Sequence, residues 1–318
     1  TQCLHAGYQP ESTTNSCAVP VYKTSSYVFN DTEHAANLFG LRELGNIYTR
    51  LMNPTTDVLE QRVTALDGGA AALGLASGTS GVFYSIINIA QEGDEIVSAN
   101  NLYGGTYTQF NDILPKFGIK VNFVDPNDPA NYAAAITDKT KALFCETVSN
   151  PGLDVADLEA IAKIADDHGI PLIVDSTFST PYLTQPIQHG ASIVIHSLTK
   201  WLGGHGNGIG GVVVDSGSFN WKNGNFPLYD EPDNSYHGLR WGHDLPEPLA
   251  PLAFILRMRT VPLRNLGACI SPDNSWQFIQ GIETLSLRME RHCENALAVA
   301  KHLQGHESVE WVRFPGLE

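Results

Sequence analysis

The sequence predicts an α/β protein with a mainly parallel sheet flanked by helices. Short β-rich runs alternate with helical patterns through the central region, which is typical of this class. Two of these runs, Leu172–Val174 and Ile193–Ile195, are continuously apolar, as expected for strands buried on both faces. With 318 residues, the chain is long enough for a large core and a second small domain.

The helix signals are clearest at residues 53–69. Asn53 suits the N-cap, Pro54 suits the first helical position, and Gly68 suits the end of the helix. Further helices are predicted at residues 79–91, 157–169 and 283–304. Strands are predicted at residues 71–78 (a strand with its turn), 94–99, 120–125, 141–146, 171–176, 192–197 and 208–215.

The composition and the predicted secondary structure divide the chain into three parts. Residues 1–45 are irregular and polar, like an arm; residues 46–265 are expected to form a large domain, and residues 266–318 to begin a small C-terminal domain. Residues 215–248 are rich in Gly, Pro, Asn, Trp and Tyr, which predicts a long surface insertion. The chain begins at Thr1 without Met and ends on a turn-like Pro315-Gly316, so we expect a fragment that lacks its C-terminal part.

The composition argues against several classes of function. A net charge of −15 disfavours a surface for nucleic acids or anionic membranes, and no apolar run is long enough to span a bilayer. The cysteines are odd in number and scattered, so they form neither a disulfide framework nor a CxxC metal site. These features predict a cytoplasmic metabolic enzyme without a metal site; the cysteines are Cys3, Cys17, Cys145, Cys269 and Cys293.

Two signals compete near residue 200. Gly206, Gly208 and Gly211 match the G-x-G-x-x-G spacing of a dinucleotide-binding loop. That loop needs a strand before its glycines and a helix after them, whereas here the glycines precede the strand-like run Val212–Asp215. The order of elements therefore disfavours a nicotinamide oxidoreductase.

The alternative is a cofactor carried on a lysine. Asp175 ends one apolar run and Lys200 follows the next, so two strands deliver both residues to the carboxyl edge of the sheet, where ligands bind. Pyridoxal phosphate needs this pair, because a lysine amine forms a Schiff base with it and a carboxylate keeps its pyridine nitrogen protonated. Taken singly, a strand-terminal Asp is more often a turn residue, and a Lys is usually only solvated.

A phosphate cradle is predicted on the same edge. Ser77, Gly78 and Thr79 lie between a strand and a helix, where N–H groups and hydroxyls can face an anion, although such a triplet is often only an N-cap. Ser197 and Thr199 can add hydroxyl donors from the other side. A ring that could stack on the cofactor is supplied by Tyr103, which follows a third strand.

A family resemblance joins these residues. The chain resembles, from Cys3 to Glu318, the pyridoxal-phosphate-dependent enzymes of Cys/Met metabolism, through the motifs NIYTRLMNPTTDVLE, NLYGGTY, ETVSNPG, VDSTFSTP and HSLTKW. The resemblance implies the fold-type I architecture. It implies three catalytic residues. Lys200 would form the Schiff base and move protons, Asp175 would pair with the pyridine nitrogen, and Tyr103 would stack on the ring and take part in proton transfer.

The resemblance also implies further roles. The phosphate would be held by Ser77, Gly78, Thr79, Ser197 and Thr199. Asn150 would lie near the phenolic oxygen of the cofactor or the substrate carboxylate. Tyr48 and Arg50 would reach the phosphate of a neighbouring subunit, which implies a homodimer unit, usually paired into a tetramer. Family members continue beyond "PGLE" and supply there an Arg for the substrate carboxylate, which no residue of this chain can be assigned to replace.

Within the family, the insertion and the stretch ACISPDNSWQFIQGIETLSLRMERH resemble O-acetylhomoserine sulfhydrylases. These enzymes replace the acetate of an acylated homoserine with sulfide or a small thiol and so make homocysteine. Two other readings stay open: a γ-lyase or cystathionine γ-synthase, and a non-catalytic truncated homologue. The aromatic insertion is either a cover for the pocket or an oligomer contact.

Overall fold

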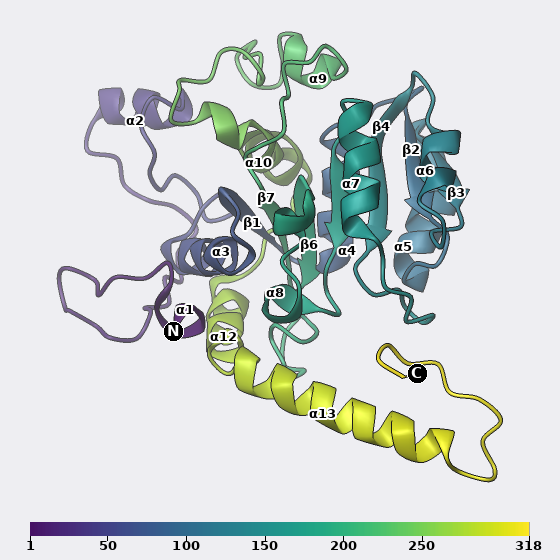
Figure 1. Ribbon diagram of the computed structural model, residues 1–318. Helices are drawn as coiled ribbons and strands as arrows, with labels where there is room; N and C mark the ends of the chain where they lie inside the picture. Colours follow the sequence, from purple (N-terminus) through teal and green to yellow (C-terminus); the bar gives the residue numbers. More distant parts are fainter. Residues whose placement is uncertain (318) are drawn as a thin grey trace.

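A seven-stranded sheet forms the centre of the computed structural model, which describes residues 1–317 (Figure 1). The strands lie in the order β1-β7-β6-β5-β4-β2-β3. Every predicted strand is present, and the bounds are β1 Ala71–Leu75, β2 Glu95–Ala99, β3 Lys120–Val124, β4 Thr140–Glu146, β5 Leu172–Asp175, β6 Ile193–Ser197 and β7 Gly211–Asp215.

The sheet is parallel except at one strand. β7 runs antiparallel to both of its neighbours, β1 and β6, and all other neighbouring pairs are parallel. The prediction of a mainly parallel sheet is therefore confirmed. β4, β6 and β7 are buried along almost their whole length. Strands that helices cover on both faces of a sheet are expected to be continuously apolar, and these strands fit that pattern.

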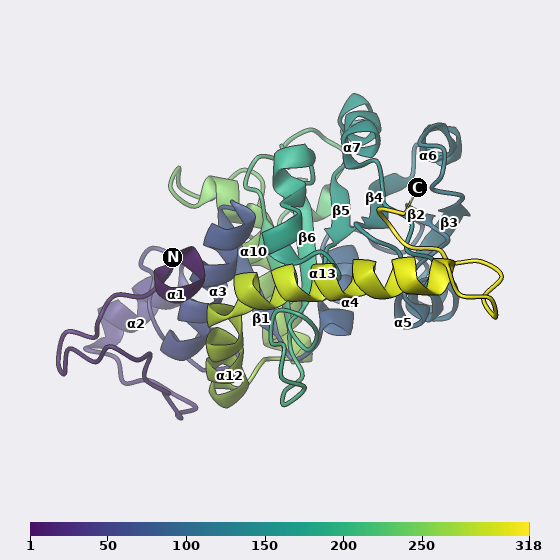
Figure 2. The same cartoon turned by 60° about the horizontal axis from the view of Figure 1, so that its bottom comes forward.

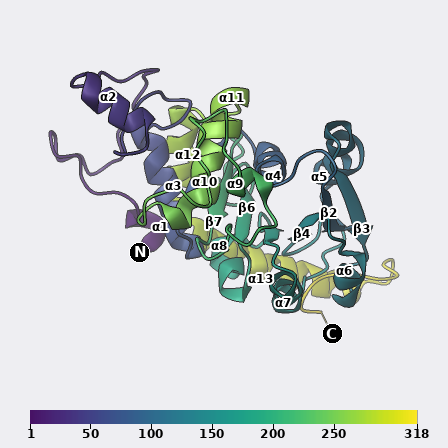
Figure 3. The same ribbon diagram turned by 90° about the horizontal axis from the view of Figure 1, so that it is seen from above.

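Helices cover the sheet on both sides (Figure 3). α4 (Gly78–Ile87) and α5 (Gly104–Thr108) lie on one side, and α7 (Leu158–Asp167) and α8 (Thr180–Leu183) lie on the other. α3 (Pro54–Asp67) packs on β1 and β7 and follows its predicted signals, because Asn53 Oδ1 accepts from the Thr55 N–H at 2.9 Å and Gly68 ends it with φ 73°. The shorter helices are α6 Ala130–Ala135, α9 Pro227–Asp230, α10 Ala253–Met258 and α11 Arg264–Leu266.

The ends of the chain lie outside this sheet. Residues 1–53 are largely irregular and carry the short helices α1 (Gln2–His5) and α2 (Thr32–Phe39). Near the other end, α13 (Leu285–Gln304) runs as one long helix across the molecule (Figure 2). The sequence predicted a single helix at 283–304 but not the preceding α12 (Pro272–Glu283), which begins where Ser271 Oγ accepts from the Asn274 N–H at 3.1 Å. Within residues 1–317, no helix combines the length and apolarity that a membrane span requires.

The aromatic insertion lies at the amino ends of the parallel strands. Lys141, at the start of β4, donates from Nζ to the Asn225 carbonyl at 2.7 Å. Asn223 Nδ2 donates to the carbonyl of Gly169, just before β5, at 2.8 Å. Trp221 stacks on Tyr229 inside the insertion, with ring centroids 4.5 Å apart. This segment therefore does not cover the ligand cavity of its own chain, because no residue of 215–248 lines that cavity and ligands bind at the opposite ends of these strands. A role as an oligomer contact stays a prediction.

Asp215, at the end of β7, is a fully buried carboxyl group. Its Oδ1 accepts from the Gly217 N–H at 2.9 Å, while Oδ2 has no partner among residues 1–317. Burial raises the pKa of Asp215 from 3.8 to about 7. The unfolded chain ionises this group at lower pH than the folded protein does, so the group costs stability progressively as the pH rises from about 4 to about 7.

We therefore expect Asp215→Asn to stabilise the protein above pH 7 and to flatten the fall in stability between pH 4 and 7. The gain is a few kcal/mol, because each unit of pKa shift corresponds to about 1.4 kcal/mol. Chemical unfolding of wild type and variant at pH 5 and pH 8 measures the effect. Equal stabilities at pH 8 would show that the Asp215 carboxylate is accommodated in the folded state without cost.

Candidate active site

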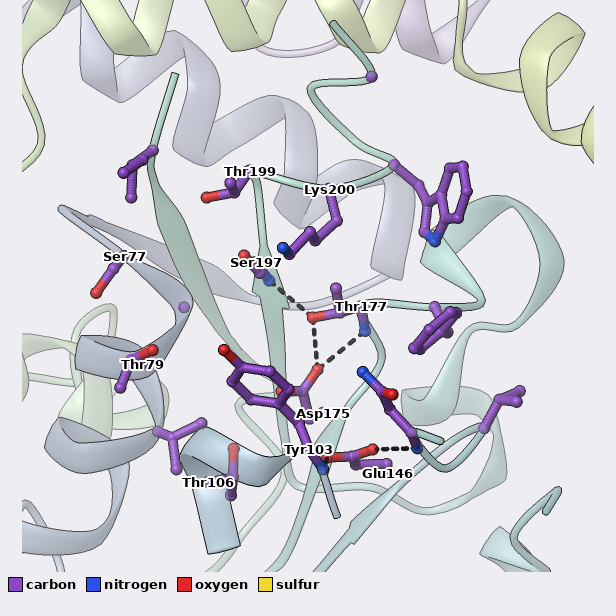
Figure 4. Close-up of a pocket in the computed structure, with 18 of the residues that line it drawn as sticks. Ser77, Thr79, Tyr103, Thr106, Glu146, Asp175, Thr177, Ser197, Thr199 and Lys200 are labelled. Carbon is purple, nitrogen blue, oxygen red and sulfur yellow. Dashed lines mark hydrogen bonds between the residues drawn. The ribbon is translucent and has the colours of Figure 1, made fainter. Parts of the chain in front are cut away.

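A cavity of about 550 Å³ opens at the carboxyl ends of the parallel strands (Figure 4). Polar residues line it on the sheet side, and apolar side chains, among them Phe178 and Trp201, line other parts of its wall. Nine of the residues predicted as site residues line this one cavity: Ser77, Gly78, Thr79, Tyr103, Asn150, Asp175, Ser197, Thr199 and Lys200.

Tyr48 and Arg50 are the predicted site residues that do not line the cavity. Both lie in the exposed segment before α3, where the Arg50 guanidinium stands over the Tyr48 ring, 5.2 Å from its centroid. Tyr48 also forms an isolated β-bridge with Ser26. A role across a subunit interface stays a prediction for these two residues, since the structure contains one chain.

The amino end of α4 forms one wall of the cavity. Ser77 is its N-cap, with Oγ accepting from the Ser80 N–H at 3.0 Å. The first N–H groups of a helix, here beginning with Gly78 and Thr79, have no acceptor within the helix and carry its positive dipole end. A Cβ at Gly78 would lie 2.8 Å from the Cβ of Ser197, so only glycine brings this helix end so close to β6. This wall suits an anion such as a phosphate.

The glycine-rich segment after Lys200 leads into the strand β7, as the sequence predicted, and no helix follows its glycines directly. Thr199 Oγ1 accepts from the Gly210 N–H at 3.1 Å, which fixes this segment beside the cavity. The next glycine, Gly211, packs so tightly that an added Cβ would overlap the Ser77 carbonyl. These glycines therefore serve close backbone packing next to the α4 end.

Asp175 lies on the floor of the cavity, held by a residue that the sequence reasoning missed. Thr177 donates to Asp175 Oδ1 from its N–H at 3.0 Å and from its Oγ1 at 2.6 Å, and Thr177 Oγ1 accepts from the Ser197 N–H at 2.8 Å (Figure 4). Asp175 Oδ2 has no hydrogen-bond donor among residues 1–317. Burial raises the pKa of Asp175, and the Thr177 hydrogen bonds act against that rise.

A buried His–Asp pair lies behind this floor. His196 Nε2 is 2.8 Å from Asp67 Oδ2, and its Nδ1 is 3.1 Å from the Ser176 carbonyl. Both side chains of the pair are fully buried. Burial lowers the pKa of His196, but the Asp67 carboxylate outweighs it, and the pKa is raised overall. The pair fixes the end of β6 to α3 and to the turn after Asp175.

Lys200 sits in a turn that α13 holds in place. Arg288 of α13 donates to the carbonyl of Trp201 at 2.7 Å and to that of Leu202 at 3.3 Å, and it also bonds the Gly281 carbonyl at 2.7 Å. The Lys200 amine itself points into the cavity (Figure 4) and forms no hydrogen bond or ion pair with any residue of 1–317. A rigid turn thus presents an amine that is free to react.

Glu146 is a second carboxyl group in the cavity and was also missed. It ends β4 beside Asp175, its register partner at the end of β5. Its oxygens accept from the N–H groups of Tyr103 at 2.7 Å and Asn150 at 3.1 Å. Burial, and then the Asp175 charge, raise the pKa of Glu146 to about 8. The strand-end rule that identified Asp175 applies equally to Glu146, so the signal was present in the sequence.

The residues of the cavity fit pyridoxal phosphate. The amino end of α4 can bind the phosphate of the cofactor. Asp175 Oδ2, which has no donor among residues 1–317, can accept from the N–H of the pyridine ring, and the unpartnered Lys200 amine can react with the aldehyde carbon. The Tyr103 ring is 47% exposed at the cavity wall, so its face is available for stacking. Residues 1–317 hold no cluster of His, Cys, Asp and Glu that could bind a metal ion.

Comparisons with known proteins agree with this fit. The model of the Cys/Met metabolism PLP-dependent enzyme family matches residues 1–318. The O-acetyl-L-homoserine sulfhydrylase of Leptospira meyeri is 56% identical over all of this chain and 73% of its own length. The homocysteine synthase of Schizosaccharomyces pombe is 50% identical over 99% of this chain and 73% of its own.

A solved structure is also similar. The structure of a putative O-acetylhomoserine (thiol)-lyase from Campylobacter jejuni matches with a TM-score of 0.94 and 40% identity, over 99% of this chain and 76% of that one. It contains N'-pyridoxyl-lysine-5'-monophosphate, a lysine joined to the cofactor. The fold is therefore that of fold-type I pyridoxal-phosphate enzymes, and the chain belongs to the family of Cys/Met-metabolism enzymes that depend on pyridoxal phosphate.

Proposed function

We propose that the protein uses pyridoxal phosphate to convert O-acetyl-L-homoserine and sulfide, or a small thiol, into L-homocysteine, or a thioether, and acetate. The observation that carries the proposal is the placement of Lys200 and Asp175 on one cavity, at the ends of adjacent parallel strands, together with the α4 end. The relatives at 50% and 56% identity are named for this chemistry, which supports the same substrate class here.

When bound, pyridoxal phosphate supplies an electron sink that stabilises negative charge on the substrate α carbon. Asp175 would keep the ring nitrogen protonated through Oδ2, since Oδ1 is already engaged by Thr177. Lys200 would hold the cofactor covalently until the substrate amine takes its place. The freed Lys200 amine would then take the proton from the substrate α carbon, and it would return a proton there after acetate has left the γ carbon and sulfide has bonded to it. An unpartnered amine on a fixed turn suits both tasks.

The remaining residues would bind and orient the cofactor. The phosphate would lie against the α4 end and the hydroxyls facing it, and the Tyr103 ring would stack on the cofactor ring. Asn150 would face the phenolic oxygen or the substrate carboxylate. The proposed phosphate contacts are Ser77, Gly78, Thr79, Ser197 and Thr199.

The apolar part of the cavity wall would exclude water. Replacement at the γ carbon requires sulfide to react before water does, so the site must be largely dry when the acetate has left. Val82, Val148, Phe178 and Ile209 line the cavity beside the polar residues and meet this need.

The nearest rivals are a γ-lyase and a cystathionine γ-synthase built on the same scaffold. Incubation with O-acetylhomoserine and sulfide, followed by mass spectrometry of the products, separates them. The proposal predicts homocysteine and acetate in equal amounts. An oxoacid with ammonia would indicate elimination, and cystathionine formed only with cysteine would indicate the synthase.

The proposal extends to the assembly and the domains. We propose a homotetramer made of two dimers, in which Tyr48 and Arg50 reach the cofactor phosphate of the neighbouring subunit; their exposure outside their own cavity supports this. We also propose an arm at residues 1–45, a cofactor-binding domain at 46–265, and the beginning of a small domain at 266–318. The cytoplasm is the proposed compartment, since Cys17, Cys269 and Cys293 are exposed free thiols.

A further inference from the structure

Glu146 connects two loops that come from different strands. Tyr103 follows β2, whereas Asn150 follows β4, and in the sheet β2 and β4 are neighbours. Each oxygen of the Glu146 carboxyl group takes one backbone N–H: Oε1 that of Tyr103 at 2.7 Å, and Oε2 that of Asn150 at 3.1 Å. Figure 4 shows Glu146 beside the backbone of Tyr103, with a dashed line marking its hydrogen bond to a neighbouring backbone nitrogen.

We propose that Glu146 is a positioning residue, which sets the Tyr103 ring and Asn150 at the correct separation for the cofactor ring between them. The inference rests on the proposed function, because it assigns a purpose to Glu146 within that site. The Glu146 side chain bonds the backbone N–H groups of both residues, so a change at Glu146 would affect the placement of the stacking ring and of the amide together.

The local contacts explain why one side chain controls this geometry. Tyr103 is 47% exposed, and its hydroxyl has no hydrogen-bond partner among residues 1–317. Its backbone is held at two points before α5: its carbonyl accepts from the Tyr107 N–H at 2.9 Å, and its N–H donates to Glu146, which is the contact that links it to another strand. Asn150 begins the loop that follows β4. Four residues later, Asp154 Oδ2 accepts from Asn101 Nδ2 at 3.0 Å, which connects this loop to the segment after β2. That second link joins the same two loops but lies beyond the cavity lining.

The chemistry of the site requires a carboxyl group at this position. Two N–H donors need two acceptor oxygens, and a carboxyl group presents one oxygen to each of them. A glutamine in the same place would turn its own NH₂ group toward one of the donors, leaving that N–H without an acceptor inside the protein. Burial and the Asp175 charge disfavour the ionised form of Glu146, and a carboxyl group perturbed in this way is typical of functional sites.

The test compares Glu146→Gln with the matched control Asp215→Asn, which also replaces a buried carboxyl group that ends a strand and accepts a backbone N–H. Each protein is stripped of cofactor and titrated with pyridoxal phosphate, and the visible circular dichroism of the saturated protein is recorded. We expect Glu146→Gln to weaken cofactor binding about tenfold, the equivalent of one lost hydrogen bond. We also expect its dichroism band to shrink, with Asp215→Asn matching wild type in both measurements.

A second measurement begins with the wild-type protein, whose own result does not depend on whether a variant folds. Hydrogen exchange followed by mass spectrometry should show the Tyr103 and Asn150 amides protected, and Glu146→Asp, whose shorter side chain cannot reach both, should lose protection at one of them. Unprotected amides in the wild type, or wild-type affinity and dichroism in Glu146→Gln, would overturn the inference. Failure of the wild type to bind pyridoxal phosphate would instead overturn the proposed function.

Discussion

Lys200→Ala is expected to remove the covalent attachment of pyridoxal phosphate and to reduce turnover of O-acetylhomoserine by a factor on the order of 10³ or more. The amine has two tasks in the proposed mechanism, attachment and proton transfer, and a positioned general acid–base group alone contributes about 10²–10⁴ in rate. The fold should remain intact, since the Lys200 side chain makes no hydrogen bond or ion pair within residues 1–317 and the Arg288 contacts to the following carbonyls persist.

The matched control is Lys163→Ala. Lys163 is exposed on α7 and forms an ion pair with Asp167 at 2.7 Å, away from the cavity. We expect wild-type kcat and cofactor content in this variant. If Lys200→Ala retained more than a tenth of the wild-type turnover, another group would have to carry the proton, and the role assigned to Lys200 would be wrong.

Asp175→Asn is expected to lower kcat/KM by a factor on the order of 10²–10³, the usual effect of removing one group that stabilises developing charge. Asparagine has nearly the same shape, and its Oδ1 can still accept from Thr177, so the floor of the cavity is preserved. The neutral side chain, however, cannot keep the ring nitrogen protonated, and the electron sink is weakened.

This variant separates binding from chemistry. Mass spectrometry after borohydride treatment should find the cofactor on Lys200 as in wild type, while steady-state kinetics show the loss in rate. Asp175→Glu would keep the charge but displace it by about one methylene, and should recover part of the lost rate. A kcat/KM for Asp175→Asn within threefold of wild type would contradict the pairing between Asp175 and the ring nitrogen.

Much of the fold and of the site could be predicted because the signals are local. The caps of α3, Asn53 and Gly68, lie next to the helix that they end. Asp175 and Lys200 follow buried strands, and parallel strands bring their carboxyl ends to one edge, so their meeting follows from the topology alone.

The features that were missed depend on contacts between distant segments. Nothing near residues 215–248 indicates that this segment packs against Lys141 and Gly169, at the far end of the strands from the cavity. β7 is antiparallel to β6 because residues 198–210 contain no helix that would carry the chain back to the other edge of the sheet. The strand direction was therefore not predicted from the β7 residues alone. Glu146 was different: its strand-end position carried the same signal as Asp175, and the reasoning did not apply the rule to it.

The most direct test is the visible spectrum of the purified protein before and after borohydride, with the modified peptide then mapped by mass spectrometry. Attachment of pyridoxal phosphate to the Lys200 amine predicts a yellow protein that borohydride bleaches, with the pyridoxyl group on Lys200. A protein that stays colourless with added pyridoxal phosphate, or that carries the pyridoxyl group on a different lysine, would contradict the assignment of this cavity as the cofactor site.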